Sequence, residues 1–186
     1  MSFCVSSQHV FLFNTTISLF RIERHLEPLA IAANVTQSTF CRLDEVLLTF
    51  SALMLNYRDL RDRGVGDRVA CDAILASLEK RWSNADQEVL IAAVILNPFF
   101  KHQPFKPLQR FQPANVYNLF IQLWARFFPQ EPIPKTALYQ NVIHYLRGMG
   151  DFQPLGQCVS ACFNISEQLV VCSFFMILEY SRQSPG

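Results

Sequence analysis

Hydrophobic residues recur at helical spacing along most of this 186-residue chain. Between residues 43 and 57 they fall at every third or fourth position, which places them on one face of a helix. The same spacing returns over residues 70–82, 116–127 and 138–146, and each stretch is closed by Gly, Pro or a group of polar residues. The pattern therefore predicts a series of amphipathic helices.

A shorter, deeply buried helix is predicted after the second of these stretches. Ser83 and Asp86 have the spacing of a capping box, whose side chains bond the free backbone N–H groups at a helix start. Residues 89–96 are all apolar, a run that periodicity alone would also allow as a buried strand. The cap and the stop at Pro98 favour a helix. We expect residues 85–96 to be the most deeply buried element.

Proline interrupts the helical pattern in two places. Residues 97–113 hold four prolines among four phenylalanines, which predicts a long packed connection without regular hydrogen bonding. We expect these phenylalanines to seal the edge of the core. Nearer the N-terminus, residues 22–33 have the composition of a helix that Pro28 either starts or kinks.

The two ends of the chain are apolar and are not assigned to an element. If the chain contains a short terminal strand, it must come from residues 3–20 or 168–178. Exposed apolar surface costs about 25 cal/mol per Å², so we expect the ends to pack on each other, on another chain or on missing sequence. The fold prediction is an all-α assembly of about six helices. Residues 21–153 form its helical region, and 1–20 and 154–186 are apolar segments.

Composition and charge narrow the classes of function. The chain is 51% apolar, and 16 basic residues against 15 acidic ones leave a net charge of +1, too small to steer nucleic acid over the whole surface. No stretch is continuously apolar over the length of a bilayer, and no basic residue precedes Arg21 as a secretory signal would require. We therefore expect an intracellular chain and no membrane partner.

The six cysteines show no disulfide-scaffold or zinc-ribbon spacing, which predicts reduced thiols. Cys158 and Cys162 could share a helical face, but zinc needs four ligands and no histidine follows them. We expect no metal, no other cofactor and no small-molecule substrate.

Several sequence blocks go beyond a generic helical pattern. They are His25–Gln37, Arg42–Leu48, Leu78–Trp82, Asp86–Glu88 and Ile91–Lys101. They resemble the helical region of hAT-family DNA transposases of the kind found in fungal genomes. The strongest elements are an Arg-Trp pair at residues 81–82 and a Leu-Asn-Pro helix end at residues 96–98. Together with the helix that contains Trp124 and the segment 145–152, the resemblance covers roughly residues 21–153.

The resemblance implies a position within a larger protein. In that family a ribonuclease H-like α/β core carries three metal-binding acidic residues and is interrupted by a large all-α insertion. This chain resembles the insertion without the core, the BED-type zinc finger or the dimerisation segment. The resemblance therefore implies a catalytically inactive fragment with at most residual DNA binding, nuclear if it follows the family.

The acidic residues agree with an inactive fragment. Two-metal phosphoryl transfer needs carboxylates held together on rigid elements such as strand ends, and no acidic residue here follows a strand-like run. We interpret the acidic residues on the helices as surface charges or caps. They are Asp44, Asp59, Asp62, Asp72, Asp86 and Glu88.

The resemblance places Trp82 where the family's tryptophan stacks on an extruded base. The alternative is a core anchor, because Trp82 completes the hydrophobic stripe of its own helix. Arg81 would then either hold a phosphate or lie at the helix end. Residues 101–147 carry six Lys or Arg against one acidic residue, interleaved with aromatics, as a nucleic-acid surface does. The predicted DNA contacts are Arg81, Trp82, Lys101, Lys106 and Arg110.

A second class of function stays open. The apolar ends and the Phe-rich loop 99–111 would also suit a helical protein-interaction module that binds another protein or a second copy of the chain. DNA binding that weakens steeply with salt would support the transposase-derived fragment. Self-association that is insensitive to salt would support the protein-interaction module.

Overall fold

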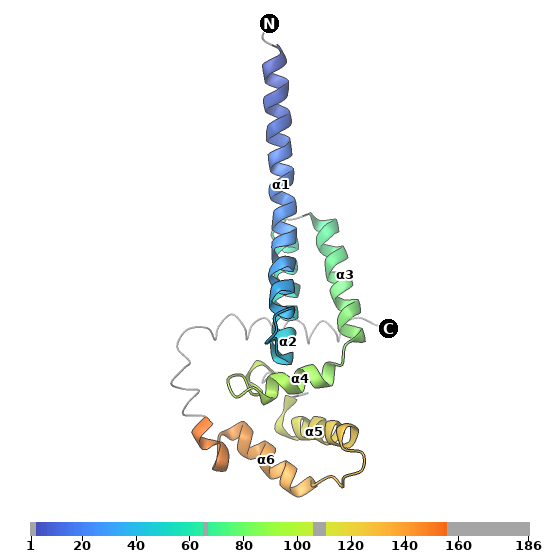
Figure 1. Cartoon of the computed structure of the whole chain (residues 1–186), viewed down its shortest axis with the longest axis vertical. Coiled ribbons are helices and arrows are strands. Elements are labelled where there is room, and N and C mark those ends of the chain that lie inside the picture. The colour runs from blue at the N-terminus through green and yellow to red at the C-terminus, as the bar shows by residue number, and fades with distance from the viewer. Residues whose placement is uncertain (1–2, 65–66, 106–110, 156–186) are drawn as a thin grey trace.

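The computed structural model describes residues 3–64, 67–105 and 111–155, with only the backbone described for residues 3–17 (Figure 1). These residues contain six α-helices and no strand, which confirms the predicted all-α fold. The α-helices are α1 (Phe3–Thr36), α2 (Leu43–Asp62), α3 (Arg68–Asn84), α4 (Gln87–Leu96), α5 (Pro113–Phe127) and α6 (Lys135–Arg147). Two 3₁₀ turns, η1 (Gln103–Phe105) and η3 (Gly150–Phe152), follow α4 and α6.

The N-terminal end of the chain is helical, so the prediction that residues 3–20 could form a strand is wrong. They form the first half of α1, a continuous helix of 34 residues with Pro28 inside it. Residues 3–27 contain neither Gly nor Pro, and extending a helix costs far less than starting one. The other candidate strand, residues 168–178, lies outside the described residues.

The helices α1, α3 and α4 all pack against α2. The C-terminal half of α1 lies along α2, and its N-terminal half projects well past α2 and α3 (Figure 1). α5 and α6 pack on each other below α4. α2 is therefore the central helix of the described chain.

Two groups of buried side chains form the core. The α4 core consists of Leu47, Trp82, Ile91, Val94, Ile95, Phe105, Phe111, Val116, Val142, Tyr145 and Leu146. The three-helix core lies among α1, α2 and α3 and consists of Ala32, Leu53, Met54, Tyr57, Cys71, Leu75 and Leu78. Phe50 packs against both groups and joins them along α2.

The predicted buried helix exists, but it starts later than the sequence indicated. Ser83 lies in the last turn of α3, and Asp86 is itself the N-cap of α4, where its carboxylate accepts a hydrogen bond from the Val89 N–H at 3.3 Å. The reason is that Ala85 adopts an extended conformation, which ends α3 and frees the next turn. As predicted, α4 is deeply buried, with Val94 and Ile95 fully enclosed.

The described part of the proline-rich connection, residues 97–105 and 111–113, packs in part as predicted, although residues 103–105 form the 3₁₀ turn η1. Phe105 and Phe111 are buried with ring centroids 4.6 Å apart, and Phe100 is partly buried against the α4 core. Phe99 is the exposed member of the four. The connection ends where Pro113 opens α5 at a position that needs no N–H donor.

Candidate functional site

Trp82 occupies the α4 core rather than the surface. It is 5% exposed and lies beside Phe50, with ring centroids 6.2 Å apart. Stacking on a base requires a ring face open to solvent. The structure therefore favours the core alternative and removes Trp82 from the predicted DNA contacts. The hydrophobic stripe over residues 70–82, which ends at Trp82, indicated the same core position.

Arg81, its neighbour, lies on the outside of α3. Its side chain lines two hollows, one of about 270 Å³ next to Trp82 and one of about 380 Å³ between α1 and α3. It forms no ion pair with any acidic residue in the described part of the chain. Arg81 is thus an accessible cation at the edge of largely apolar hollows.

The other predicted DNA contacts are not gathered around Arg81. Lys101 is half-buried, and its ammonium lies 5.4 Å from the centroid of the Tyr145 ring, a cation–π contact with α6. Lys106 and Arg110 lie outside the described residues. Arg126, on α5, pairs with Asp86 at the start of α4. The described part of the predicted basic surface is therefore divided between α3, α5, α6, which carries Lys135 and Arg147, and the turn after α4.

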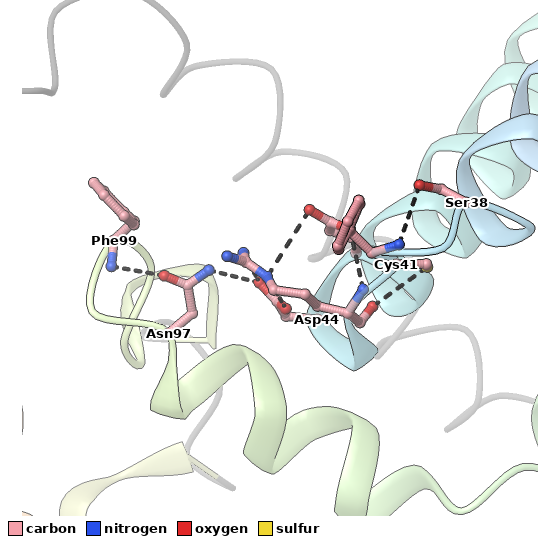
Figure 2. Close-up of polar contacts among 8 residues, drawn as sticks. Ser38, Cys41, Asp44, Asn97 and Phe99 are labelled. Carbon is pink, nitrogen blue, oxygen red and sulfur yellow. Dashed lines mark hydrogen bonds and ion pairs between the residues drawn. The ribbon is translucent and has the colours of Figure 1, made fainter.

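A buried polar link between α2 and α4 was not expected from the sequence (Figure 2). The Asp44 carboxylate is 5% exposed and accepts a hydrogen bond from the Asn97 side-chain amide at 2.5 Å. It also accepts from the Arg42 guanidinium, at 3.0 and 2.7 Å. The Asn97 side-chain oxygen accepts from the Phe99 N–H at 2.9 Å. The prediction that Asp44 is a surface charge is therefore wrong.

The link fixes the protonation of Asp44 as well as its position. Burial, the largest single influence, raises the pKa of this carboxyl. Hydrogen bonds from Arg42 and Asn97 and the charge of Arg42 act in the opposite direction and together hold the pKa below its ordinary value. Asp44 is consequently an ionised structural residue that holds the start of α2 against the end of α4. Asp44 and Asn97 both lie in sequence blocks that carry the family resemblance, and this was the one feature of the sequence that could have drawn attention to them.

The remaining acidic residues are placed largely as predicted. Asp59, Asp62 and Asp72 are exposed and pair with arginines, and Asp86 caps α4. Glu88 is partly exposed in the first turn of α4.

Among the described residues no three His, Cys, Asp or Glu side chains come together as a metal site would require. Cys71 is buried, whereas Cys158 and Cys162 lie outside the described residues. None of the helices that the structure describes is both long and apolar enough to cross a bilayer.

Comparison with known proteins adds no further assignment. The chain matches no protein-family model, no curated protein and no solved structure.

Proposed function

We propose that this chain is a non-catalytic helical protein-interaction module whose binding surface is the projecting part of α1, residues 3–24. The observation that carries the proposal is the exposure of two adjacent large apolar side chains on that part, Leu19 at 61% and Phe20 at 65%. Leaving such side chains in water is unfavourable by about 25 cal/mol per Å². A partner that covers them would gain this free energy.

The projecting part begins where α1 leaves α2. At that point the Tyr57 hydroxyl donates a hydrogen bond to the backbone carbonyl of His25, and the Asp67 N–H donates to the imidazole Nε2 at 3.1 Å. These bonds fasten α1 to the two neighbouring helices. Residues before this point extend away from the rest of the molecule (Figure 1).

The partner that the sequence supports best is a second copy of α1. Val5, Leu12 and Leu19 recur every seven residues, the spacing that brings apolar side chains to the seam of a coiled coil. The intervening seam positions, Gln8 and Thr15, are polar, which favours a modest affinity over a permanent zipper. A pair of identical helices would give a two-fold symmetric dimer.

The Phe-rich loop contributes less to such a function than the sequence indicated. Phe105 and Phe111 are buried in the α4 core, so they are not free to bind a partner. Phe99 is exposed in the loop, but less so than Leu19 and Phe20 of α1. The C-terminal apolar end lies largely outside the described residues, so α1 is the surface that we propose.

The oligomeric state tests the proposal. We expect the wild-type chain to form dimers whose mass, measured by light scattering after gel filtration, is unchanged between low and high salt. Leu19→Glu, which puts a charge on the proposed seam, should give a monomer with unchanged helix content. Ala30→Glu adds the same charge at an exposed position of α1 outside the projecting part, and it should leave the dimer intact. A wild-type chain that stays monomeric at high concentration would overturn the proposal.

DNA binding is the second candidate, favoured by the exposed position of Arg81 on α3, where no acidic side chain of the described residues pairs with it. It rests on the proposed origin of the chain as a fragment of a hAT-type transposase. Binding to a short DNA hairpin should weaken steeply with salt and should weaken further in Arg81→Gln. Hairpin binding that is equal in wild type and Arg81→Gln would exclude Arg81 as a phosphate contact.

A further inference from the structure

Two hollows follow one another along α1 and α3, and together they form a groove whose floor at one end is α2. The larger hollow, about 460 Å³, combines the apolar Ile22, Leu26 and Ala70 with the polar Arg21, His25 and Asp67. The other hollow, about 380 Å³, is lined mainly by apolar side chains that α1, α2 and α3 all contribute. Three helices with a groove along one side lack the fourth member of a helical bundle.

We propose that the groove is occupied by the chain's own C-terminal segment, residues 168–178, which completes a four-helix bundle. Nine of its eleven residues are apolar, and only Gln168 and Ser173 are polar. The segment carries no charge, as an occupant of an apolar groove requires. The groove shares Arg21 and Ile22 with the projecting part of α1, but Leu19 and Phe20 do not line it, so the two proposals are tested at different side chains.

The dimensions of the groove fit a helix made of this segment. Its walls run from Arg21 to Thr36 on α1, about 22 Å, and from Ala70 to Arg81 on α3, about 16 Å, at 1.5 Å per residue. As a helix, residues 168–178 would cover about 15 Å, whereas as a strand they would cover about 33 Å. The twelve residues from 156 to 167 can span up to about 40 Å, which lets the segment reach the groove.

Charged residues at the two ends of the groove define the direction in which the C-terminal segment would run. Arg81 lines one end and Arg21 the other, where Asp67 also lies. The apolar segment is bounded by Glu167 and Glu179. In an up-down-up-down bundle the fourth helix runs opposite to α3, which places Glu167 beside Arg81 and Glu179 beside Arg21.

The tether favours this segment over the same segment of a second copy. A segment joined to its site through a short stretch of the same chain meets that site at an effective concentration in the millimolar range. A second copy competes only at comparable protein concentrations. Occupation of the groove would also give Arg81 an acidic partner and reduce its value as a DNA contact.

Chemical crosslinking tests the position of the segment. Ser77 lines the groove, whereas Ala76 is exposed about 100° further round α3 and lines neither hollow. In a full-length background that keeps Cys172 and the buried Cys71 but has serine at Cys4, Cys41, Cys158 and Cys162, a short bismaleimide should join Cys172 to Ser77→Cys within one chain. The yield for Ala76→Cys should be at least about tenfold lower, because only the first position shares a site with the segment.

Two further measurements make the outcome decisive. Arg81→Glu should lower the yield of the crosslink at position 77, and adding Glu167→Arg should restore it. Equal yields at positions 76 and 77, or a crosslink found only between two chains, would overturn the proposal. Gel filtration of the same samples reports the α1 dimer separately, so failure of one proposal is distinguishable from failure of the other.

Discussion

At the scale of single residues, Asp44 shows how one carboxylate joins helices that are distant in the sequence. Its position near the start of a predicted helix is typical of a surface charge or cap. Its burial depends on Asn97, 53 residues away, which no local pattern reveals. The sequence therefore predicted the helix that carries Asp44 but not the environment of its side chain.

Replacing this carboxylate should lower stability in a pH-dependent way. Asp44→Asn weakens the bonds to Arg42 and Asn97, and hydrogen bonds to charged groups contribute about 1.5–3 kcal/mol each at most. We expect the free energy of unfolding at pH 7, from urea denaturation, to fall by about 1–3 kcal/mol. Asp59→Asn, which removes an exposed ion pair with Arg63, should cost less than about 1 kcal/mol.

The pH dependence has a definite sign. Because the folded chain holds the pKa of Asp44 below its ordinary value, the stabilisation is present above about pH 4 and is lost as the pH falls through the folded pKa. Wild type should therefore lose more stability than Asp44→Asn on acidification below pH 4. Parallel acid titrations of the two proteins would contradict this role.

Trp82 is the second residue whose role can be measured. Trp82→Ala should reduce the free energy of unfolding by about 3–5 kcal/mol, because it removes a buried side chain from the α4 core. Trp82→Phe, which retains most of the volume, should cost clearly less. Thermal melts monitored by circular dichroism compare the two, and a melt of Trp82→Ala that matches wild type would return the indole to the list of possible base contacts.

At the scale of elements, hydrophobic periodicity located the helices but not all of their ends. The stripes over residues 43–57, 70–82, 116–127 and 138–146 each lie within an observed helix. The start of α4 was misplaced by one turn because Ser83 and Asp86 are both good caps, and only the extended backbone at Ala85 decides between them. The first half of α1 was missed because its apolar residues, which include an unbroken run over residues 10–13, do not follow a single helical stripe in the sequence.

The cap of α4 can be separated from its ion pair. The Asp86 carboxylate both caps α4 and pairs with Arg126. Asp86→Ala removes both interactions and should lower the midpoint of denaturant unfolding measurably. Asp86→Asn keeps a capping side chain and loses only the exposed ion pair, so its midpoint should stay close to that of wild type. Equal losses in the two variants would show that the ion pair dominates.

At the scale of the whole molecule, the groove and the division of the predicted basic surface both arise from the arrangement of helices around α2. Arg81 and Trp82 are neighbours in the sequence, yet one faces solvent and the other the core, because adjacent positions on a helix point about 100° apart. The sequence placed both residues on the correct helix. It could not predict which face α2 would cover.

Local stability should differ strongly along the chain. Amides in residues 3–24 belong to a helix without neighbours in the described chain on most sides (Figure 1), whereas those of α4 lie in the core. In dilute, monomeric samples we expect hydrogen exchange to show opening free energies near 0–1 kcal/mol for residues 5–20 and about 5 kcal/mol or more for α4. Strong protection of residues 5–20 in a monomer would show that they are covered within one chain.

The length of α1 makes the molecule suitable for distance measurements by fluorescence energy transfer. From Phe3 to the anchoring hydrogen bonds at His25, the helix axis covers about 33 Å. This distance suits energy transfer between a fluorophore at the first turn and another on α2. A bend of α1 at His25 would change the efficiency of energy transfer, so movement of residues 3–24 could be followed in single molecules.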